Sequence, residues 1–395
     1  MRDRLRVLGS TEHTHTRRLL PDGDACVLED QVEWRTPFTS LGGDTRVRKE
    51  LGRVFAWRHR VTRVDLERSR DPAARALVVG VTGASGFLGR ALCTALAMRG
   101  HRAMRFVRAP AAARAGEIAW DPARGELDYG QLAGLDAVIH LAGASLAGGR
   151  WTPERKRELI ESRVLSTATL ARALSALCAS SSAMAAGHVL RRPRVLVSAS
   201  AVGWYGNRGQ ESVHESSAPG EGFLAELTRQ WEDAAEPARA AGLRVVHPRM
   251  GIVLWPGEGA LAKLAAPFYF GVGGPLGNGR AWWSWITLHD LLDALLFAVE
   301  HDSFTGAFNA VAPQPVRQRE IARAIGRALS RPALMPAPEI ALRMLLGREQ
   351  ADEMLFASQR VVARALIAAG FTFRDPELAP ALKRLFGVPR LEPVA

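Results

Sequence analysis

The pattern of apolar and polar positions divides the chain near residue 72. Before it, "CVLEDQVEW" places Leu28, Val32 and Trp34 on one face of a predicted β-strand. A second strand is predicted in "EHTHTRRLL", and "VRKELGRVFAWRHRV" has a helical apolar face formed by Val47, Leu51, Val54, Phe55 and Val61. Residues 1–72 are therefore expected to form a fragment of two strands and one helix, which is too short to be stable alone.

After "RSRDPAAR" at 68–75, a charged and aperiodic segment that we interpret as a linker, predicted strands alternate with predicted helices. This alternation is typical of an α/β fold in which helices cover both faces of a parallel sheet. We predict a doubly wound parallel sheet (Rossmann domain) over residues 76–312. A smaller C-terminal substrate lobe, assembled mainly after residue 250, is closed by residues 313–388.

Three glycines follow the first strand of this domain, at Gly83, Gly86 and Gly89 in "GVTGASGFLGR". Gly83 permits a tight turn, Gly86 lets the backbone approach a pyrophosphate, and Gly89 lets the next helix pack on the strand. The N-terminus of that helix then faces the anion. Because a strand precedes the glycines and a helix follows them, the sequence predicts dinucleotide binding.

The second strand, "AMRFVR", indicates which dinucleotide is bound. It ends at Arg108, with no Asp or Glu beside it. An acidic residue there would bind the ribose 2′-hydroxyl of NAD, whereas an arginine suits the 2′-phosphate of NADP. The alternative is that Arg108 is one more arginine in an arginine-rich chain. The pattern favours NADP over NAD.

The composition limits the partners and the compartment. Lysine occurs only at positions 49, 156, 263 and 383, so arginine supplies nearly all of the 52 basic residues, which are spread along the chain. The net charge of +12 is thus a general bias, and no nucleic-acid partner is expected. No apolar run is long enough for a membrane span, so no membrane partner is expected either. The three scattered cysteines, Cys26, Cys93 and Cys178, fit a reducing cytoplasm.

No metal site is expected. His13 and His15 share one face of a predicted strand, but the sequence shows no carboxylate or cysteine partner at ligand spacing. We interpret them as a polar strand face.

Six segments occur in a fixed order: "VTGASGFLG", "DAVIHLAGASLAGGRWTPERKRELIESR", "VLVSASAVGWYGNRG", "GFLAELTRQWE", "GVGGPLGNGRAWWSWITLHDL" and "FNAVAPQPV". Together they resemble the NAD(P)-binding "epimerase family protein" group. This is an atypical branch of the extended short-chain dehydrogenase/reductases, sometimes labelled as cell-division inhibitors. Residues 313–388 resemble the small domain of unknown function that closes these proteins, and residues 1–72 resemble the C-terminal half of a START-like (polyketide-cyclase-type) domain.

The resemblance implies an NADP site made by two loops and by further arginines. The matching positions are Gly83, Ser85, Gly86, Phe87, Leu88, Gly89, Arg108, Leu141, Ala142, Gly143, Arg163 and Arg249. Arg163 stands where the wider superfamily has an active-site asparagine. For Arg249, an ion pair at the end of its strand is an equal alternative.

The chemistry that the resemblance implies is incomplete in this chain. Extended short-chain dehydrogenases use a serine and Tyr-x-x-x-Lys, in which the lysine lowers the tyrosine pKa so that the tyrosine can move a proton. Ser200 in "SASA" matches the serine, but Phe223 and Leu227 stand where tyrosine and lysine are expected. Tyr205, on the loop after Ser200, is a candidate replacement, with packing as its alternative.

Four further expectations concern the lobe and the helices. The segment "NGRAWWSWITLHD" places Arg280, Trp283, Trp285 and His289 together, either as a substrate pocket or as packing. Asp290 is expected to be the N-cap of the next helix. Thr152 is expected as N-cap and Pro153 as first residue of a long helix. That helix and the one near 223–241 form a dimer interface in the superfamily, so a homodimer is expected by analogy.

Two functions of different classes follow from these observations. The first is an NADP-dependent oxidoreductase or epimerase acting on an unidentified small molecule, with Ser200 holding a substrate oxygen. The second is an NADP-dependent sensor that acts through a protein partner without turnover. Loss of the usual acid supports the sensor, whereas retention of Ser200 supports the enzyme.

Overall fold

The computed structural model of the chain describes residues 2–4, 12–23, 25–35, 43–67, 75–108, 114–183 and 192–387. They belong to two compact units, one that includes the first 67 residues and one that spans residues 68–386. The second unit contains both the predicted sheet and residues 313–386, so the boundary predicted at residue 312 stays a prediction.

The first unit is an antiparallel sheet in the order β1-β2-β3 with one long helix; the apolar pattern predicted β2, β3 and the helix but not β1. Its elements are β1 (Arg2–Arg4), β2 (Glu12–Asp22), β3 (Ala25–Arg35) and α1 (Gly43–Glu67). On α1, Val47 is buried and Leu51 and Phe55 are half-buried, but Val54 is 52% exposed. The prediction for Val54 was wrong: the buried face of α1 is centred on Leu51 and Phe55, and Val54 lies at its edge.

His15 has a carboxylate partner that the sequence did not reveal. Strand pairing places Arg17 opposite Asp30, and the Asp30 carboxylate lies 2.7 Å from His15 Nε2 and 3.0 Å from His59 Nε2. Burial opposes ionisation of Asp30, but hydrogen bonds from His59, His15 and Arg17 outweigh it and lower the Asp30 pKa. The guanidinium of Arg58 also lies 3.6 Å from this carboxylate. Because Arg17 and Arg58 already pair with Asp30, this cluster suits ion pairing and not metal binding. The side chain of His13 lies outside the described residues.

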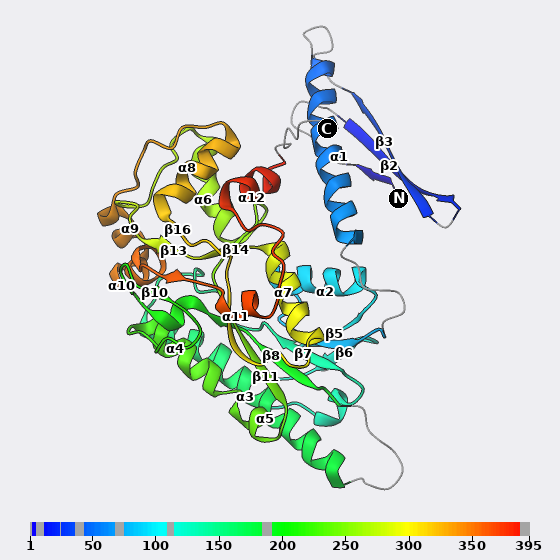
Figure 1. The fold of residues 1–395 in the computed structure, drawn as a ribbon, viewed down its shortest axis with the longest axis vertical. Helices are drawn as coiled ribbons and strands as arrows, with labels where there is room; N and C mark the ends of the chain where they lie inside the picture. The colour runs from blue at the N-terminus through cyan, green and yellow to red at the C-terminus, as the bar shows by residue number, and fades with distance from the viewer. Residues whose placement is uncertain are drawn as a thin grey trace. The chain divides into compact units, whose positions relative to one another are not determined.

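The second unit is built on a parallel sheet in the order β15-β11-β8-β7-β4-β5-β6, with the short β9 paired to β11 (Figure 1). This confirms the predicted doubly wound fold. The strands are β4 (Val78–Thr82), β5 (Arg102–Val107), β6 (Glu117–Ala119), β7 (Ala137–His140), β8 (Val195–Ser198), β9 (Ser200–Ala201), β11 (Arg244–Met250) and β15 (Gly306–Ala310).

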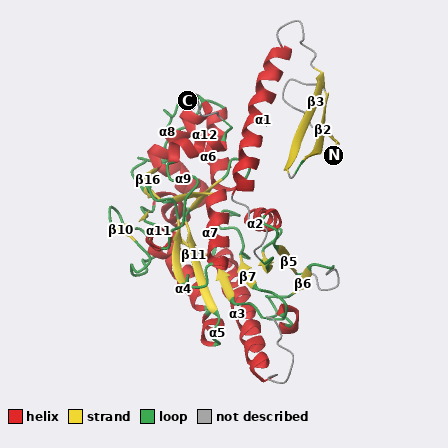
Figure 2. Cartoon of the chain, turned by 45° about the vertical axis from the view of Figure 1, so that its right-hand side comes forward, coloured by secondary structure: helices red, strands yellow, loops and turns green. Residues whose placement is uncertain are grey.

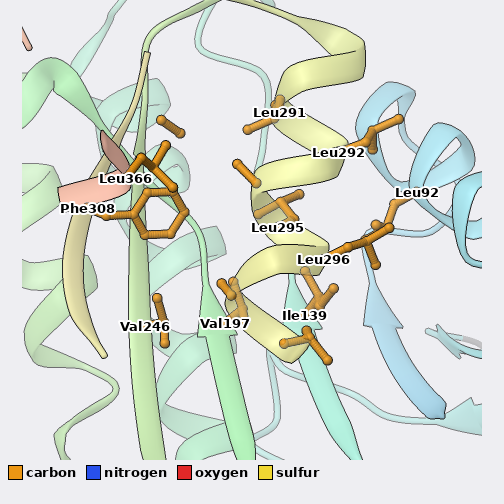
Figure 3. Close-up of a cluster of buried hydrophobic side chains, with 14 of the residues drawn as sticks. Leu92, Ile139, Val197, Val246, Leu291, Leu292, Leu295, Leu296, Phe308 and Leu366 are labelled. Atoms are coloured by element: carbon orange, nitrogen blue, oxygen red, sulfur yellow. The ribbon is translucent and has the colours of Figure 1, made fainter. Parts of the chain in front are cut away.

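Helices cover both faces of this sheet, as Figure 2 shows. On one face, α2 (Phe87–Met98) and α7 (Leu288–Glu300) bury leucines against alternate strand residues; Figure 3 shows Leu295 and Leu296 beside Val197 and Ile139. On the other face lie α3 (Pro153–Ala183) and α5 (Glu236–Ala240), and near them α4 (Phe223–Asp233). Strands buried on both sides explain the uninterrupted apolar runs in the sequence.

The lobe after residue 250 has its own core around Trp285 and Phe268. Its helices are α6 (Gly259–Tyr269), α8 (Gln318–Leu329), α9 (Glu339–Leu346), α10 (Arg348–Ala351), a π-turn over Asp352–Phe356, α11 (Arg364–Ala368) and α12 (Leu378–Leu385). Short strands join it to the loops above the sheet: β10 (Ser212–Val213), β12 (Ile252–Leu254), β13 (Trp282–Trp283), β14 (Trp285–Thr287), β16 (Val316–Arg317) and β17 (Arg360–Val361).

Two helix starts test the capping predictions. The α3 helix begins at Pro153, and the Arg155 N–H donates to Thr152 Oγ1 at 3.2 Å, which confirms Thr152 as N-cap. The prediction for Asp290 was wrong, because α7 begins at Leu288 and its N-cap is Thr287. Asp290 instead lies inside the first turn, where burial raises its pKa to about 6.

Candidate active site at the carboxyl edge of the sheet

The glycine-rich loop joins β4 to α2. Gly83 has a φ of +65°, and a methyl group there would lie 2.8 Å from the Leu141 carbonyl oxygen. A methyl group at Gly89 would overlap the Gly83 carbonyl. The N-cap of α2 is Gly86, which has no capping side chain. The helix therefore presents its first N–H groups without an internal acceptor, and this backbone cradle suits a pyrophosphate.

The residues predicted around this loop are brought together. Ser85 and Gly86 are exposed, and Phe87 and Leu88 are half-buried at the start of α2. The predicted second loop, Leu141–Ala142–Gly143, lies directly beside the first. Thr82 Oγ1 fixes this contact, because it accepts hydrogen bonds from Leu141 N (3.0 Å) and Ala142 N (3.2 Å).

Arg108 follows β5 immediately and is exposed. The described residues of this strand end, 102–108, contain no carboxylate, as the NADP prediction requires. A guanidinium at this end of β5 suits a ribose 2′-phosphate, and this role of Arg108 stays a prediction.

Arg163 lies in the third turn of α3 and is buried. Its guanidinium carbon lies 5.1 Å from the centre of the Trp231 ring, and a methyl group at Gly143 would lie 3.2 Å from it. Burial and then the charge of Arg155 lower the Arg163 pKa to about 10. Arg163 thus packs against Gly143 in the loop at residues 141–143. Its contact with a cofactor stays a prediction.

Ser200 lies at the carboxyl edge as predicted, but its hydroxyl is occupied. Ser200 is fully buried, and its Oγ donates to Glu232 Oε1 at 2.6 Å. Arg249 donates to both oxygens of the same carboxylate, from Nε at 2.8 Å and from Nη2 at 2.9 Å. The predicted ion pair at the end of the strand therefore exists, and it is buried. Burial opposes the charge on Arg249, but Glu232 outweighs it and raises the Arg249 pKa.

Tyr205 belongs to the same buried network. Its hydroxyl donates to Asn309 Oδ1 at 2.8 Å and accepts from Arg249 Nη1 at 3.1 Å. The ring is fully buried, and burial raises the Tyr205 pKa. These contacts favour a positioning role, and the proton transfer suggested for Tyr205 stays a prediction.

Phe223 and Leu227 occupy the first two turns of α4. Leu227 is buried, whereas Phe223 is half-buried and packs edge-on against Trp151, with ring centres 4.9 Å apart. The start of the helix is capped from the C-terminal segment, because the N–H groups of Phe223 and Leu224 donate to the Glu353 carboxylate at 2.8 and 2.7 Å. The sequence contains no local signal for this cap.

The aromatic cluster predicted in the lobe is packing. Trp283 is 5% exposed and Trp285 is fully buried, and their Nε1 atoms donate to the carbonyl groups of Leu355 and Gln314. Arg280 is exposed, whereas His289 packs edge-on against Trp255. These four residues therefore do not form one pocket wall.

A twisted parallel sheet of this order, with a glycine turn at the start of α2, defines a dinucleotide-binding α/β protein. The model of the NAD dependent epimerase/dehydratase family matches residues 79–310, and a domain of unknown function (DUF1731) matches residues 337–385. The chain belongs to the NAD dependent epimerase/dehydratase family.

Relatives support this assignment over most of the chain. An epimerase family protein of Mycobacterium leprae is 40% identical over 310 residues, which cover 78% of this chain and 96% of that protein. A chloroplastic relative of Arabidopsis thaliana is 35% identical and covers 78% of this chain and 86% of its own length.

Two solved structures are similar. The human epimerase family protein SDR39U1 with NADPH has 32% identity and a TM-score of 0.69, covering 78% of this chain and 99% of its own. A nucleoside-diphosphate sugar epimerase from Corynebacterium glutamicum has 30% identity and a TM-score of 0.68, covering 96% of this chain and 72% of its own. Because the second match covers 96% of this chain, it includes residues of the first unit. The START-like resemblance of that unit stays a prediction.

No helix among the described residues is both long enough and apolar enough to cross a membrane.

Proposed function

We propose that the chain is an NADP-dependent oxidoreductase or epimerase acting on a small molecule that carries a hydroxyl or carbonyl group. The observation that carries the proposal is the start of α2 without a side-chain cap, in a glycine loop that Thr82 ties to the loop at residues 141–143. When bound, the dinucleotide supplies or accepts a hydride. Arg108, at the end of β5, is proposed to bind the 2′-phosphate.

Cofactor choice is the first test. Arg108→Asp replaces the guanidinium by a carboxylate at the 2′-phosphate, which should cost on the order of 2 kcal/mol in NADPH binding. Arg102→Asp is the matched control, because Arg102 is an exposed arginine at the opposite end of the same strand. Calorimetry should show weaker NADPH binding in the first variant only. Equal affinities of the unmodified chain for NADPH and NADH would contradict the NADP assignment.

Turnover is the second test. The protein with NADPH should be screened against carbonyl compounds and sugar nucleotides by nicotinamide absorbance. Ser200→Ala should then lower turnover while NADPH affinity stays nearly constant, because the Ser200 hydroxyl is proposed to turn from Glu232 to the substrate oxygen in the transition state. Equal losses of rate and cofactor affinity would instead indicate a cofactor-positioning role for Ser200.

Location and assembly complete the proposal. We infer a cytoplasmic protein from its three scattered cysteines, and a homodimer through α3 and α4 by analogy with the superfamily. Light scattering on the purified chain should give twice the mass of one chain. A mass of one chain at micromolar concentration would contradict the dimer.

A further inference from the structure

One cationic side chain lies at the place where the family's tyrosine is missing. Lys156 is in the first turn of α3, and its Nζ lies 5.0 Å from the centre of the Phe223 ring. Trp151 packs edge-on against the same ring. Phe223 is the first residue of α4 and lacks any group that can move a proton. Lys156 Nζ is therefore a proton-carrying group directly beside this ring.

The C-terminal segment holds this lysine in place. Lys156 Nζ forms an ion pair with Glu349 on α10. The neighbouring Gln350 is 2% exposed and donates from Nε2 to the carbonyl groups of Leu146 (3.3 Å) and Gly149 (3.1 Å). Its buried Oε1 has no hydrogen-bond partner among the described residues. Glu349 and Gln350 thus tie α10 to the start of α3 and to the loop before it, which holds Lys156 Nζ over the Phe223 ring.

Residue type and burial distinguish Lys156 from the other basic residues. Arginine supplies nearly all positive charge in this chain, and its guanidinium does not release a proton in proteins. Lysine ammonium can do so. The other three lysines, at 49, 263 and 383, are exposed, whereas the Lys156 side chain is 27% exposed. The buried hydroxyls of Ser200 and Tyr205 already donate to Glu232 and Asn309.

We propose that Lys156 takes the place of the missing tyrosine, binding the substrate oxygen and supplying its proton. The inference rests on the function proposed above. As the substrate carbon takes up a hydride, the electron pair of the carbonyl π bond moves to oxygen. An N–H bond of the Lys156 ammonium breaks, an O–H bond forms on that oxygen, and the neutral amine regains a proton from water. In the reverse direction each transfer runs backward. Glu349 holds the ammonium group over Phe223.

Amine footprinting tests this placement without a known substrate. The full chain is treated with an amine-acylating reagent alone, with NADPH, and with 2′-phospho-ADP-ribose, which lacks the nicotinamide ring. Mass spectrometry then gives the labelling rate of each of the four lysines. NADPH should slow the labelling of Lys156 several-fold, whereas 2′-phospho-ADP-ribose should leave it unchanged. The labelling rate of each of Lys49, Lys263 and Lys383 should be the same with and without either ligand.

The outcomes separate the two proposals. NADPH binding without selective protection of Lys156, or equal protection by both ligands, would overturn this inference and leave the proposed function standing. A complete lack of NADPH binding, checked by calorimetry on the same sample, would remove both.

Variants distinguish proton transfer from a simple latch between α3 and α10. Lys156→Arg keeps the positive charge beside Glu349 and should therefore restore a structural ion pair, but it cannot release a proton. We expect Lys156→Met and Lys156→Arg to lose turnover alike, with NADPH affinity unchanged, while the surface control Lys263→Met behaves as the unmodified chain. Full activity of Lys156→Arg would show that Lys156 is a latch.

Discussion

The glycine loop at residues 83–89 and the serine region around residue 200 lie at the same edge of one sheet but are built differently. The loop is proposed to bind the dinucleotide through backbone groups, and its packing requires the lack of side chains at Gly83 and Gly89. The serine region consists of side chains locked together, with Ser200, Glu232, Arg249 and Tyr205 in one buried network. The first can be recognised locally, whereas the second depends on residues far apart in the chain.

The comparison also explains how the chain departs from the tyrosine–lysine pattern. The packing of the glycine loop leaves no space for side chains at Gly83 and Gly89, so there the chain keeps glycine. A proton donor, by contrast, only needs a side chain that reaches the substrate oxygen. A neighbouring helix can provide that side chain. Phe223 at the start of α4 is contacted by α3 and capped by Glu353 from the C-terminal segment.

The largest expected effect is the loss of the buried ion pair in the serine region. Arg249→Met leaves the Glu232 carboxylate buried without its counter-charge and should lower the free energy of unfolding by about 3–5 kcal/mol. The matched control is Arg229→Met, which breaks the exposed pair with Glu226 on the same helix and should cost about 0.5 kcal/mol or less. Urea denaturation measures both. Similar small losses would show that the network contributes little to stability.

The next largest effect concerns the loop. Gly89→Ala puts a methyl group onto the Gly83 carbonyl, and forcing the loop apart should cost on the order of 3 kcal/mol of stability. At Gly86 a methyl group would lie 3.2 Å from the same oxygen, a contact that a small shift relieves. Gly86→Ala should therefore nearly keep the stability but weaken NADPH binding. Equal melting temperatures for the two variants would contradict this division of roles.

A third prediction uses pH to test the buried strand end beneath both regions. Burial and then the charge of Arg163 lower the His140 pKa to about 3, below its unfolded value of about 6.5. The unfolded chain therefore binds the proton first, so this contribution to stability is full above pH 6.5 and is lost as the pH falls toward 3. From pH 7 to pH 5 the loss should be about 2 kcal/mol.

Urea denaturation at these two pH values checks the estimate. His140→Gln keeps hydrogen-bonding atoms near Thr82 and Ser166 but does not titrate. The variant should lose less stability than the unmodified chain between pH 7 and pH 5. Identical losses in both would assign the acid sensitivity to other groups, among them the buried His247, whose pKa is also lowered by burial.

The sequence predicted the elements whose signals are local. Apolar runs and alternation identified the parallel sheet, and the glycine spacing identified the tight turn between β4 and α2. Thr152 was recognised as a cap, but Asp290 was misassigned, because its carboxylate accepts the N–H groups of Arg374 and Asp375 from a distant segment. The same physical reason hid Glu232 and Glu353. Glu232 binds Ser200 across 32 residues of sequence, and Glu353 binds the start of α4 across 130 residues. No local sequence pattern reveals contacts over such separations.

The smallest expected effect comes from removing the first unit, and it tests whether the carboxyl edge of the sheet works alone. A chain that starts at Pro72 should be soluble and bind NADPH with unchanged affinity and melting temperature. The sheet begins only at Val78, and its cores are formed by residues from Leu77 onward.

Contacts inside the first unit support this expectation. Phe55 packs edge-on against His15 at 5.3 Å, and the half-buried residues of β3 alternate with exposed ones, so the unit uses its apolar face internally. The competing view is that Trp34, Phe55 and Trp57, of which the side chain of Trp57 lies outside the described residues, cover an apolar surface of the sheet unit. In that case truncation would expose that surface, and the shortened chain would aggregate or melt earlier with weaker NADPH binding. Either result would decide for the competing view and make the first unit part of the working fold.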